Sequence, residues 1–134
     1  MSEFDAWNSK VIEEFHANNG KVNGGNSVLL LTTTGAKSGK KRLNPLAYTT
    51  DGERLVIIAS KGGAPTNPDW YHNVVANPDV TVEVGAETFE ARATVAEGAE
   101  RDELYAKQAA LMPNFAEYQA KTTRKIPVIV LTRK

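Results

Sequence analysis

Four cations within six residues form the part of this sequence best suited to hold a ligand. The stretch GAKSGKKR, residues 35–42, places Lys37, Lys40, Lys41 and Arg42 around Ser38 and Gly39. Cationic side chains, a hydroxyl group and backbone N–H groups left open by glycine can converge on a phosphate or a carboxylate. The pattern therefore predicts an anion site, and the alternative is a solvated, lysine-rich turn.

The same stretch does not fit the loop that binds nucleoside triphosphates. Three residues separate its two glycines where that loop has four, and Lys41 stands where Ser or Thr is required. The stretch also leads into a predicted strand, whereas the triphosphate loop opens a helix. The predicted ligand is therefore a small molecule that carries an anionic group.

A second glycine-rich segment with a cation follows the apolar run 54–59. This run is predicted as a strand that ends in Ser60, Lys61, Gly62 and Gly63. In an antiparallel meander it neighbours the strand that carries Arg42, so Lys61 and Arg42 could face one pocket. The two glycines would let a flat ligand approach the backbone closely.

A helix is predicted directly after this segment, with Asn67 as its N-cap and Pro68 at its first position. The positive end of its dipole would then face the Lys61 segment. An earlier helix is predicted over about residues 4–19. Its apolar stripe contains Phe4, Trp7, Val11 and Phe15. The favoured interpretation is a helix packed on a sheet, and peripheral contact with a membrane interface stays open.

The remaining pattern predicts a small mainly β fold with added helices. Strands are predicted at 80–84, 87–95 and 126–131, in addition to the hairpin around residues 35–42 and the strand 54–59. Six short antiparallel strands close most simply into a barrel, so we expect one domain over residues 1–134. A helix is expected over 97–112. Met112, Phe115 and Tyr118 would share one face if helical structure continues through Pro113.

The composition argues against several classes of function. The formal net charge is zero, which argues against a general nucleic-acid binder. There is no cysteine and there are only two histidines, so a metal site is not expected. No apolar run approaches the roughly 20 residues needed to cross a bilayer, and the N-terminus has no signal pattern, so we expect a cytoplasmic protein.

Three long stretches resemble a known family. They are LLLTTTGAKSGKKRLNPLAY, then IIASKGGAPTNPDWYHNVVANPDVTVEV, and near the end AEYQAKTTRKIPVIVLTR. Together they look like the deazaflavin-dependent nitroreductase family, small split β-barrel oxidoreductases of actinobacteria that use coenzyme F420. The resemblance covers nearly the whole chain. It implies an α+β fold built on a six-stranded antiparallel split β-barrel of the FMN-binding type, with peripheral helices.

The resemblance also implies roles for particular residues. The phosphate and acidic tail of the deazaflavin would be held by Lys37, Ser38, Gly39, Arg42 and Lys61. The ring would lie along Pro45 and the backbone of Ala59, Ser60, Lys61, Gly62 and Gly63. The pocket would be completed by Asn67, Pro68, Trp70 and Asn73. The acceptor would be held by Met112, Phe115 and Tyr118, with Ser60 or Tyr118 as proton donor.

The implied activity is transfer of a hydride from reduced deazaflavin to an electron-poor acceptor such as a quinone, an enone, an unsaturated lactone or a nitro compound. Met112 and Phe115 stand where nitroimidazole-reducing relatives can carry tyrosine, a departure that concerns nitroimidazoles and leaves hydride transfer unaffected. Two alternatives are an FMN-binding split-barrel flavoprotein and a non-enzymatic small barrel that binds nucleic acid or an acidic partner. The acceptor and the oligomeric state stay open.

Overall fold

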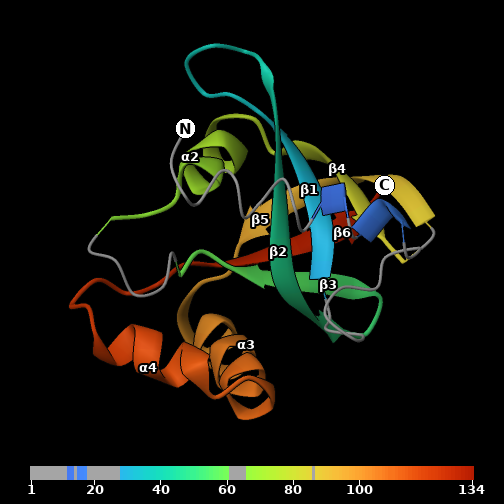
Figure 1. Ribbon diagram of the computed structural model, residues 1–134. Helices are drawn as coiled ribbons and strands as arrows, with labels where there is room; N and C mark the ends of the chain where they lie inside the picture. The colour runs from blue at the N-terminus through green and yellow to red at the C-terminus, as the bar shows by residue number, and fades with distance from the viewer. Residues whose placement is uncertain (1–11, 14, 18–27, 61–65, 86) are drawn as a thin grey trace.

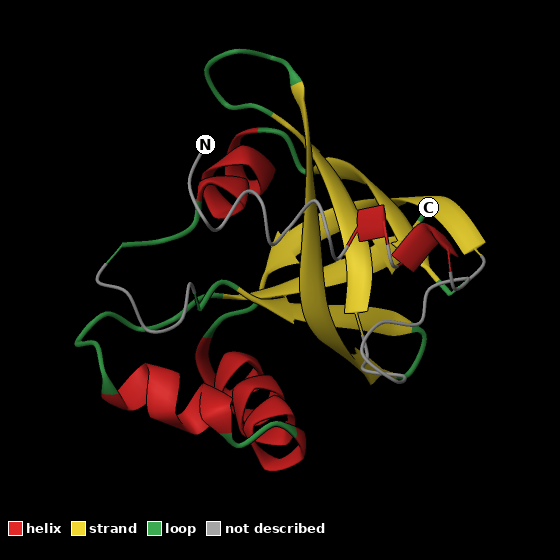
Figure 2. Ribbon diagram, viewed as in Figure 1, coloured by secondary structure: helices red, strands yellow, loops and turns green. Residues whose placement is uncertain are grey.

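Six antiparallel strands form a closed barrel in the computed structural model (Figures 1 and 2), which describes residues 12, 13, 15–17, 28–60, 66–85 and 87–134. The strands are β1 (Val28–Thr34), β2 (Lys41–Asp51), β3 (Arg54–Ile58), β4 (Asp79–Val84), β5 (Glu87–Val95) and β6 (Val128–Arg133). Their order around the barrel is β1-β2-β3-β6-β5-β4. The predicted six-stranded antiparallel barrel with peripheral helices is confirmed.

Helices lie outside the barrel at two ends. In the described part of the chain they include α2 (Asp69–Ala76), α3 (Gly98–Leu111) and α4 (Asn114–Ala120). Figure 1 shows α2 beside the loop that joins β1 to β2, whereas α3 and α4 lie together at the opposite, lower end of the view. No described helix is long and apolar enough to cross a membrane.

Several strands are apolar on both faces because one face points into the barrel and the other is covered by a helix. Leu29 and Leu31 of β1 point into one core cluster together with Ile57, Ile129 and Leu131. Residues of opposite parity in the same strands belong to other clusters, because successive side chains point to opposite faces. The cluster beneath α3 and α4 contains Val56, Ile58, Val128, Val130, Leu104, Tyr105 and Phe115. The helices therefore cover outward-facing apolar patches of the barrel.

The predicted N-terminal helix falls mostly outside the described residues, including Phe4, Trp7 and Val11. Residues 12, 13 and 15–17 are helical, and Phe15 is buried against Leu30 of β1. Packing on the barrel, the favoured interpretation, is confirmed for Phe15.

β2 has an unusual first half. Its pairing with β1 runs from Val28↔Ala47 to Thr34↔Lys41, whereas its pairing with β3 covers only Tyr48 to Asp51. Pro45 lies in the first half, opposite Leu30. Proline has no N–H group to donate, so it suits a strand segment that pairs on one side only.

One detail of the predicted helices was wrong. The N-cap of α2 is Pro68, which is extended and makes no side-chain capping bond, so Asn67 is not the cap and Pro68 is not the first helical residue. The Asn67 side chain is instead bonded to Arg124. α3 ends at Leu111, and Pro113 caps the separate helix α4, so the condition for one continuous helical face through Pro113 is not met.

Candidate functional site

A pocket of about 1070 Å³ lies between the loop that joins β1 to β2 and helix α2. Its lining comes from the loop, from the start of β2, from α2 and from the described part of the N-terminal helix. The lining residues are Ile12, Gly35, Ala36, Lys37, Ser38, Lys41, Arg42, Leu43, Asn44, Asp69, Trp70, His72 and Asn73. We call this hollow the cationic pocket.

The cations of this pocket outnumber its carboxylates by three to one. Lys37, Lys41 and Arg42 line it, and Asp69 is the acidic lining residue. Lys41 donates to the hydroxyl of Thr34 at 2.9 Å. Lys37 and Arg42 are exposed, and within the described part of the chain neither has a hydrogen-bond or ion-pair partner. These two side chains are therefore available to an anionic ligand.

Glycine shapes the loop over residues 35–40. The Gly35 N–H donates to the Lys40 carbonyl at 2.8 Å, and the Gly39 N–H donates to the Gly35 carbonyl at 3.0 Å. A Cβ atom on Gly35 would lie 2.6 Å from the Ser38 hydroxyl oxygen, and Gly39 has φ +70°. Position 39 favours glycine because its positive φ would strain a residue with a side chain, whereas a side chain at position 35 would displace the Ser38 hydroxyl.

Helix α2 and its C-cap residue hold the loop and the end of β1 in place through two asparagines. Asn73 is buried, and its Oδ1 atom accepts from the Ala36 N–H at 3.0 Å. The Nδ2 atom of Asn73 donates to the Thr33 hydroxyl at 3.1 Å, and Asn77 donates to the Thr34 carbonyl at 3.3 Å. Asn73 thus lines the pocket while both of its amide atoms bond to β1 and the loop.

The predicted cofactor residues divide between two places. The cationic pocket brings together Lys37, Ser38, Arg42, Trp70 and Asn73, and Gly39 forms part of its loop. Pro45, Ala59, Ser60, Asn67 and Pro68 are not among its lining residues, and Lys61, Gly62 and Gly63 lie outside the described residues.

Arg124 contacts three of the predicted cofactor residues that do not line the cationic pocket, namely Ala59, Ser60 and Asn67. Its guanidinium donates to the Ala59 carbonyl at 3.2 Å, to the Ser60 carbonyl at 2.7 Å and to Oδ1 of Asn67 at 2.7 Å. Burial lowers the pKa of Arg124, yet a guanidinium stays charged in proteins. Sequence reasoning did not assign Arg124 a role, although the residue lies in the basic run 121–125 and in the last of the three family-like stretches.

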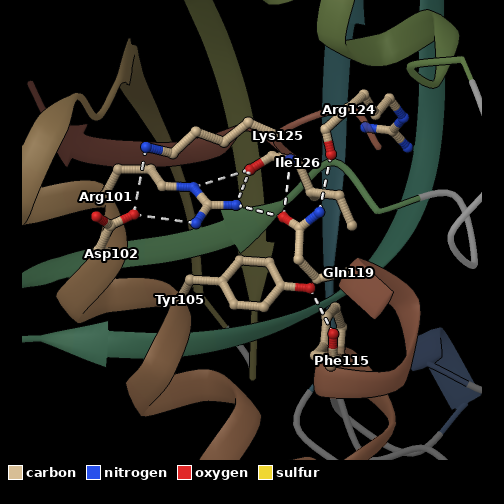
Figure 3. Close-up of polar contacts among 8 residues, drawn as sticks. All are labelled: Arg101, Asp102, Tyr105, Phe115, Gln119, Arg124, Lys125 and Ile126. Carbon is tan, nitrogen blue, oxygen red and sulfur yellow. Dashed lines mark hydrogen bonds and ion pairs between the residues drawn. The ribbon is translucent and has the colours of Figure 1, made fainter. Parts of the chain in front are cut away.

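A buried network around Arg101 holds the segment that carries Arg124 (Figure 3). Arg101 donates twice to the Ile126 carbonyl, at 3.1 and 2.7 Å, and once to Gln119 at 2.8 Å. Gln119 in turn accepts from the Ile126 N–H and donates to the Arg124 carbonyl at 2.8 Å. These contacts, which we call the Arg101 network, fix the backbone on both sides of residue 125.

The predicted acceptor residues lie beside this network. Phe115 is buried in the core cluster under α3 and α4, and Met112 and Tyr118 pack against that cluster. The rings of Phe115 and Tyr118 meet edge to face, with centroids 5.3 Å apart. Tyr105 donates to the Phe115 carbonyl at 2.5 Å, and burial raises the pKa of Tyr105, so this phenol keeps the proton that it donates.

Comparison with known proteins identifies the family. A family model described as F420H(2)-dependent quinone reductase matches residues 7–133. The chain belongs to this family. An F420H(2)-dependent quinone reductase of Mycobacterium tuberculosis is 42% identical over 117 residues, which cover 85% of this chain and 78% of that protein.

Two solved structures extend the comparison. An F420-H2 dependent reductase (FDR-A) is 45% identical with a TM-score of 0.72, and the match covers 78% of this chain and 92% of that one. A chain described as a domain-swapped dimer is 39% identical with a TM-score of 0.74, covering 95% and 98%. The resemblance stated from the sequence, to small split-barrel F420-dependent oxidoreductases, is therefore confirmed.

Proposed function

We propose that this member of the F420H(2)-dependent quinone reductase family binds reduced F420 and uses it to reduce a quinone or a related electron-poor acceptor. The observation that carries the proposal is the cationic pocket, where Lys37 and Arg42 are exposed and have no partners within the described part of the chain. The names of the similar reductases support the same cofactor and acceptor class.

The cationic pocket suits the phosphate and acidic tail of F420. Lys37, Ser38 and Arg42 would hold the anionic groups, and Lys41 would add positive charge from β2. Charge-assisted hydrogen bonds to phosphate and carboxylate are the strong class of hydrogen bond, so these contacts would supply much of the affinity. The volume of about 1070 Å³ leaves room for a ligand of cofactor size.

The ring of the cofactor would lie beyond this pocket, along Pro45 and the backbone of Ala59 and Ser60. Both Ala59 and Ser60 are buried, and their carbonyl oxygens are already occupied by Arg124. The main chain here therefore has a fixed conformation on which a flat ring could stack. The predicted contacts of Lys61, Gly62 and Gly63 lie outside the described residues and stay predictions.

F420, when bound in its reduced form, supplies a hydride from its ring carbon C5. The task of the protein is to hold the acceptor over that atom and to exclude water. Met112 and Tyr118, beside the buried Phe115, would form the acceptor wall. The Tyr118 hydroxyl accepts from Nδ2 of Asn114 at 2.8 Å. Because Tyr118 accepts that bond through its oxygen, its own proton is free to protonate a reduced product; Ser60 is the second candidate.

Fluorescence titration of the purified protein with F420, and separately with FMN, tests the cofactor. We expect saturable binding of F420 that is tighter than binding of FMN and that weakens with added salt, since several cations would contact the tail. Reduction of a soluble quinone by F420H2 with this protein then tests the reaction. Preference for FMN would replace the cofactor, and binding of neither would overturn the proposed function.

A further inference from the structure

The structure places one charged side chain across the strand end where the deazaflavin ring is expected. Arg124 contacts Ala59 and Ser60 at the end of β3, and it contacts Asn67 just before α2. It thus joins two parts of the chain that the sequence separates by several residues. The acceptors at these contacts are two backbone carbonyls and an amide oxygen, so here the guanidinium aligns backbone and amide groups.

We propose that Arg124 is a positioning residue that sets the conformation of the Ala59–Ser60 backbone and the place of Asn67 before the cofactor binds. This inference rests on the proposed function, since it concerns the same cofactor. Binding to a backbone that is already ordered avoids the entropy cost of ordering it on binding.

The planar fork of the guanidinium suits this task. One terminal nitrogen bonds to Ala59 and Asn67, and the other bonds to Ser60. A lysine ammonium is a compact charge on a flexible stem and cannot reproduce this pattern of donors. Replacement by lysine therefore keeps the charge but removes the geometry.

The Arg101 network fixes the position from which Arg124 reaches these atoms. Gln119 bonds to the Arg124 carbonyl and to the Ile126 N–H, and Arg101 bonds to the Ile126 carbonyl. In Figure 3 the Arg124 guanidinium points away from this network while its carbonyl faces Gln119. A direct hydrogen bond extends the same linkage, because the Ala59 N–H donates to the Pro127 carbonyl at 3.0 Å. The segment 124–127 is therefore tied to both α3 and the end of β3.

The first test compares Arg124→Lys and Arg124→Ala with the unaltered protein in F420 titrations and in steady-state reduction of a quinone by F420H2. We expect both variants to weaken F420 binding by about tenfold or more, because binding would then have to order the backbone that Arg124 holds in the unaltered protein. The KM for F420H2 should rise by a similar factor while kcat changes by less than about threefold, because Arg124 orders the binding site and does not touch the reacting atoms.

Lys125→Ala is the matched control. It removes a positive charge from the next residue, whose ammonium pairs with the exposed Asp102 at 3.4 Å. We expect F420 affinity to stay within about twofold of the unaltered protein, because exposed charges outside a binding site contribute little. If Lys125→Ala weakens binding as much as Arg124→Lys, the effect is one of overall charge and the proposal is overturned.

A double-variant experiment separates positioning from general destabilisation. Asn67→Ala removes the amide oxygen that accepts the 2.7 Å hydrogen bond from Arg124. If Arg124 acts partly through Asn67, the two changes share one effect. The fold-loss of F420 affinity in the double variant should then be clearly smaller than the product of the fold-losses in the two single variants. Losses that simply multiply, or an Arg124→Lys variant that binds F420 normally, would overturn the inference. Failure of the unaltered protein to bind F420 would instead overturn the proposed function.

Discussion

The two ends of the barrel use positive charge in opposite ways. At the cationic pocket, Lys37 and Arg42 are exposed and have no hydrogen-bond or ion-pair partner within the residues described. At the other end, Arg101 is buried and bonds to the Ile126 carbonyl, to Gln119 and to Asp102. The comparison suggests that cations with their donors satisfied by the protein fix its structure, whereas cations left without partners are available to a ligand.

The strongest test of this contrast is Arg101→Ala. The change leaves the buried Ile126 carbonyl and the Gln119 amide without their charged partner. We expect the free energy of unfolding to fall by about 3 kcal/mol, measured by denaturant titration. Arg92→Ala is the control, since Arg92 is largely exposed and lies 4.0 Å from Asp79, and its loss should cost less than about 0.5 kcal/mol. Equal losses in the two variants would remove the distinction.

Arg42→Ala and Lys37→Ala should show the opposite profile. We expect each to weaken F420 binding by about 1.5–3 kcal/mol for each charge-assisted hydrogen bond lost. The free energy of unfolding should change by no more than about 0.5 kcal/mol, because neither side chain bonds to the rest of the described chain. Fluorescence titration and denaturant unfolding measure the two quantities. Lys134→Ala, which removes a lysine paired with Asp79, should leave affinity unchanged.

Asn73→Ala tests a residue that belongs to both classes: Asn73 lines the pocket, and yet both of its side-chain amide atoms form hydrogen bonds within the protein. The change removes bonds to the Ala36 N–H and to the Thr33 hydroxyl. We expect a loss of about 1–2 kcal/mol in the free energy of unfolding, together with weaker F420 binding because the loop over residues 35–40 is no longer held. Asn114→Ala, which removes one exposed bond to Tyr118, should have little effect on unfolding. A stability loss without any change in affinity would show that the loop does not depend on Asn73.

The smallest expected effect is a pH dependence at Asp102. The hydrogen bond from Arg101, and then Lys125, lower the pKa of Asp102 below its ordinary 3.8. A carboxyl group with a lowered pKa in the folded protein stabilises it above the ordinary pKa, and this contribution is lost as the pH falls through the folded value. Asp102→Asn should therefore be slightly less stable than the unaltered protein at neutral pH, and the difference should shrink below pH 3.8. Denaturant unfolding at several pH values measures it, and a constant difference would contradict the assignment.

Local patterns were sufficient to predict the barrel. Alternating or continuous apolar runs predicted five of the strands, and the return of the chain after residues 35–42 predicted β2. Gly52 and Gly85, with φ +61° and +58°, form the turns expected in two of the hairpins. The cations of the cationic pocket could also be grouped from the sequence, since Lys37, Lys41 and Arg42 lie close together along the chain; that they bind an anion stays a prediction. These features depend on residues that are close along the chain.

The errors and omissions concern contacts between distant residues. Asn67 looked like a helix cap because its type and position fit, but its amide oxygen bonds to Arg124, which is 57 residues away. The continuous face of Met112 and Phe115 depended on helical structure through Pro113; Pro113 instead caps a new helix, and the barrel surface buries Phe115. Nothing in the spacing of Arg101, Gln119 and Ile126 indicates that they meet. The residues of the predicted ring site at 61–63 lie outside those described and stay predictions.

The place of β6 in the barrel has a consequence for biosynthesis. β6 lies between β3 and β5, and residues 124–127, which hold the ends of the predicted ring site, directly precede it. While a ribosome is still adding these residues, β3 and β5 each lack a neighbouring strand, and an unpaired strand edge invites aggregation. The nascent chain therefore closes the barrel and orders the predicted ring site together, only after residues 124–133 have left the exit tunnel.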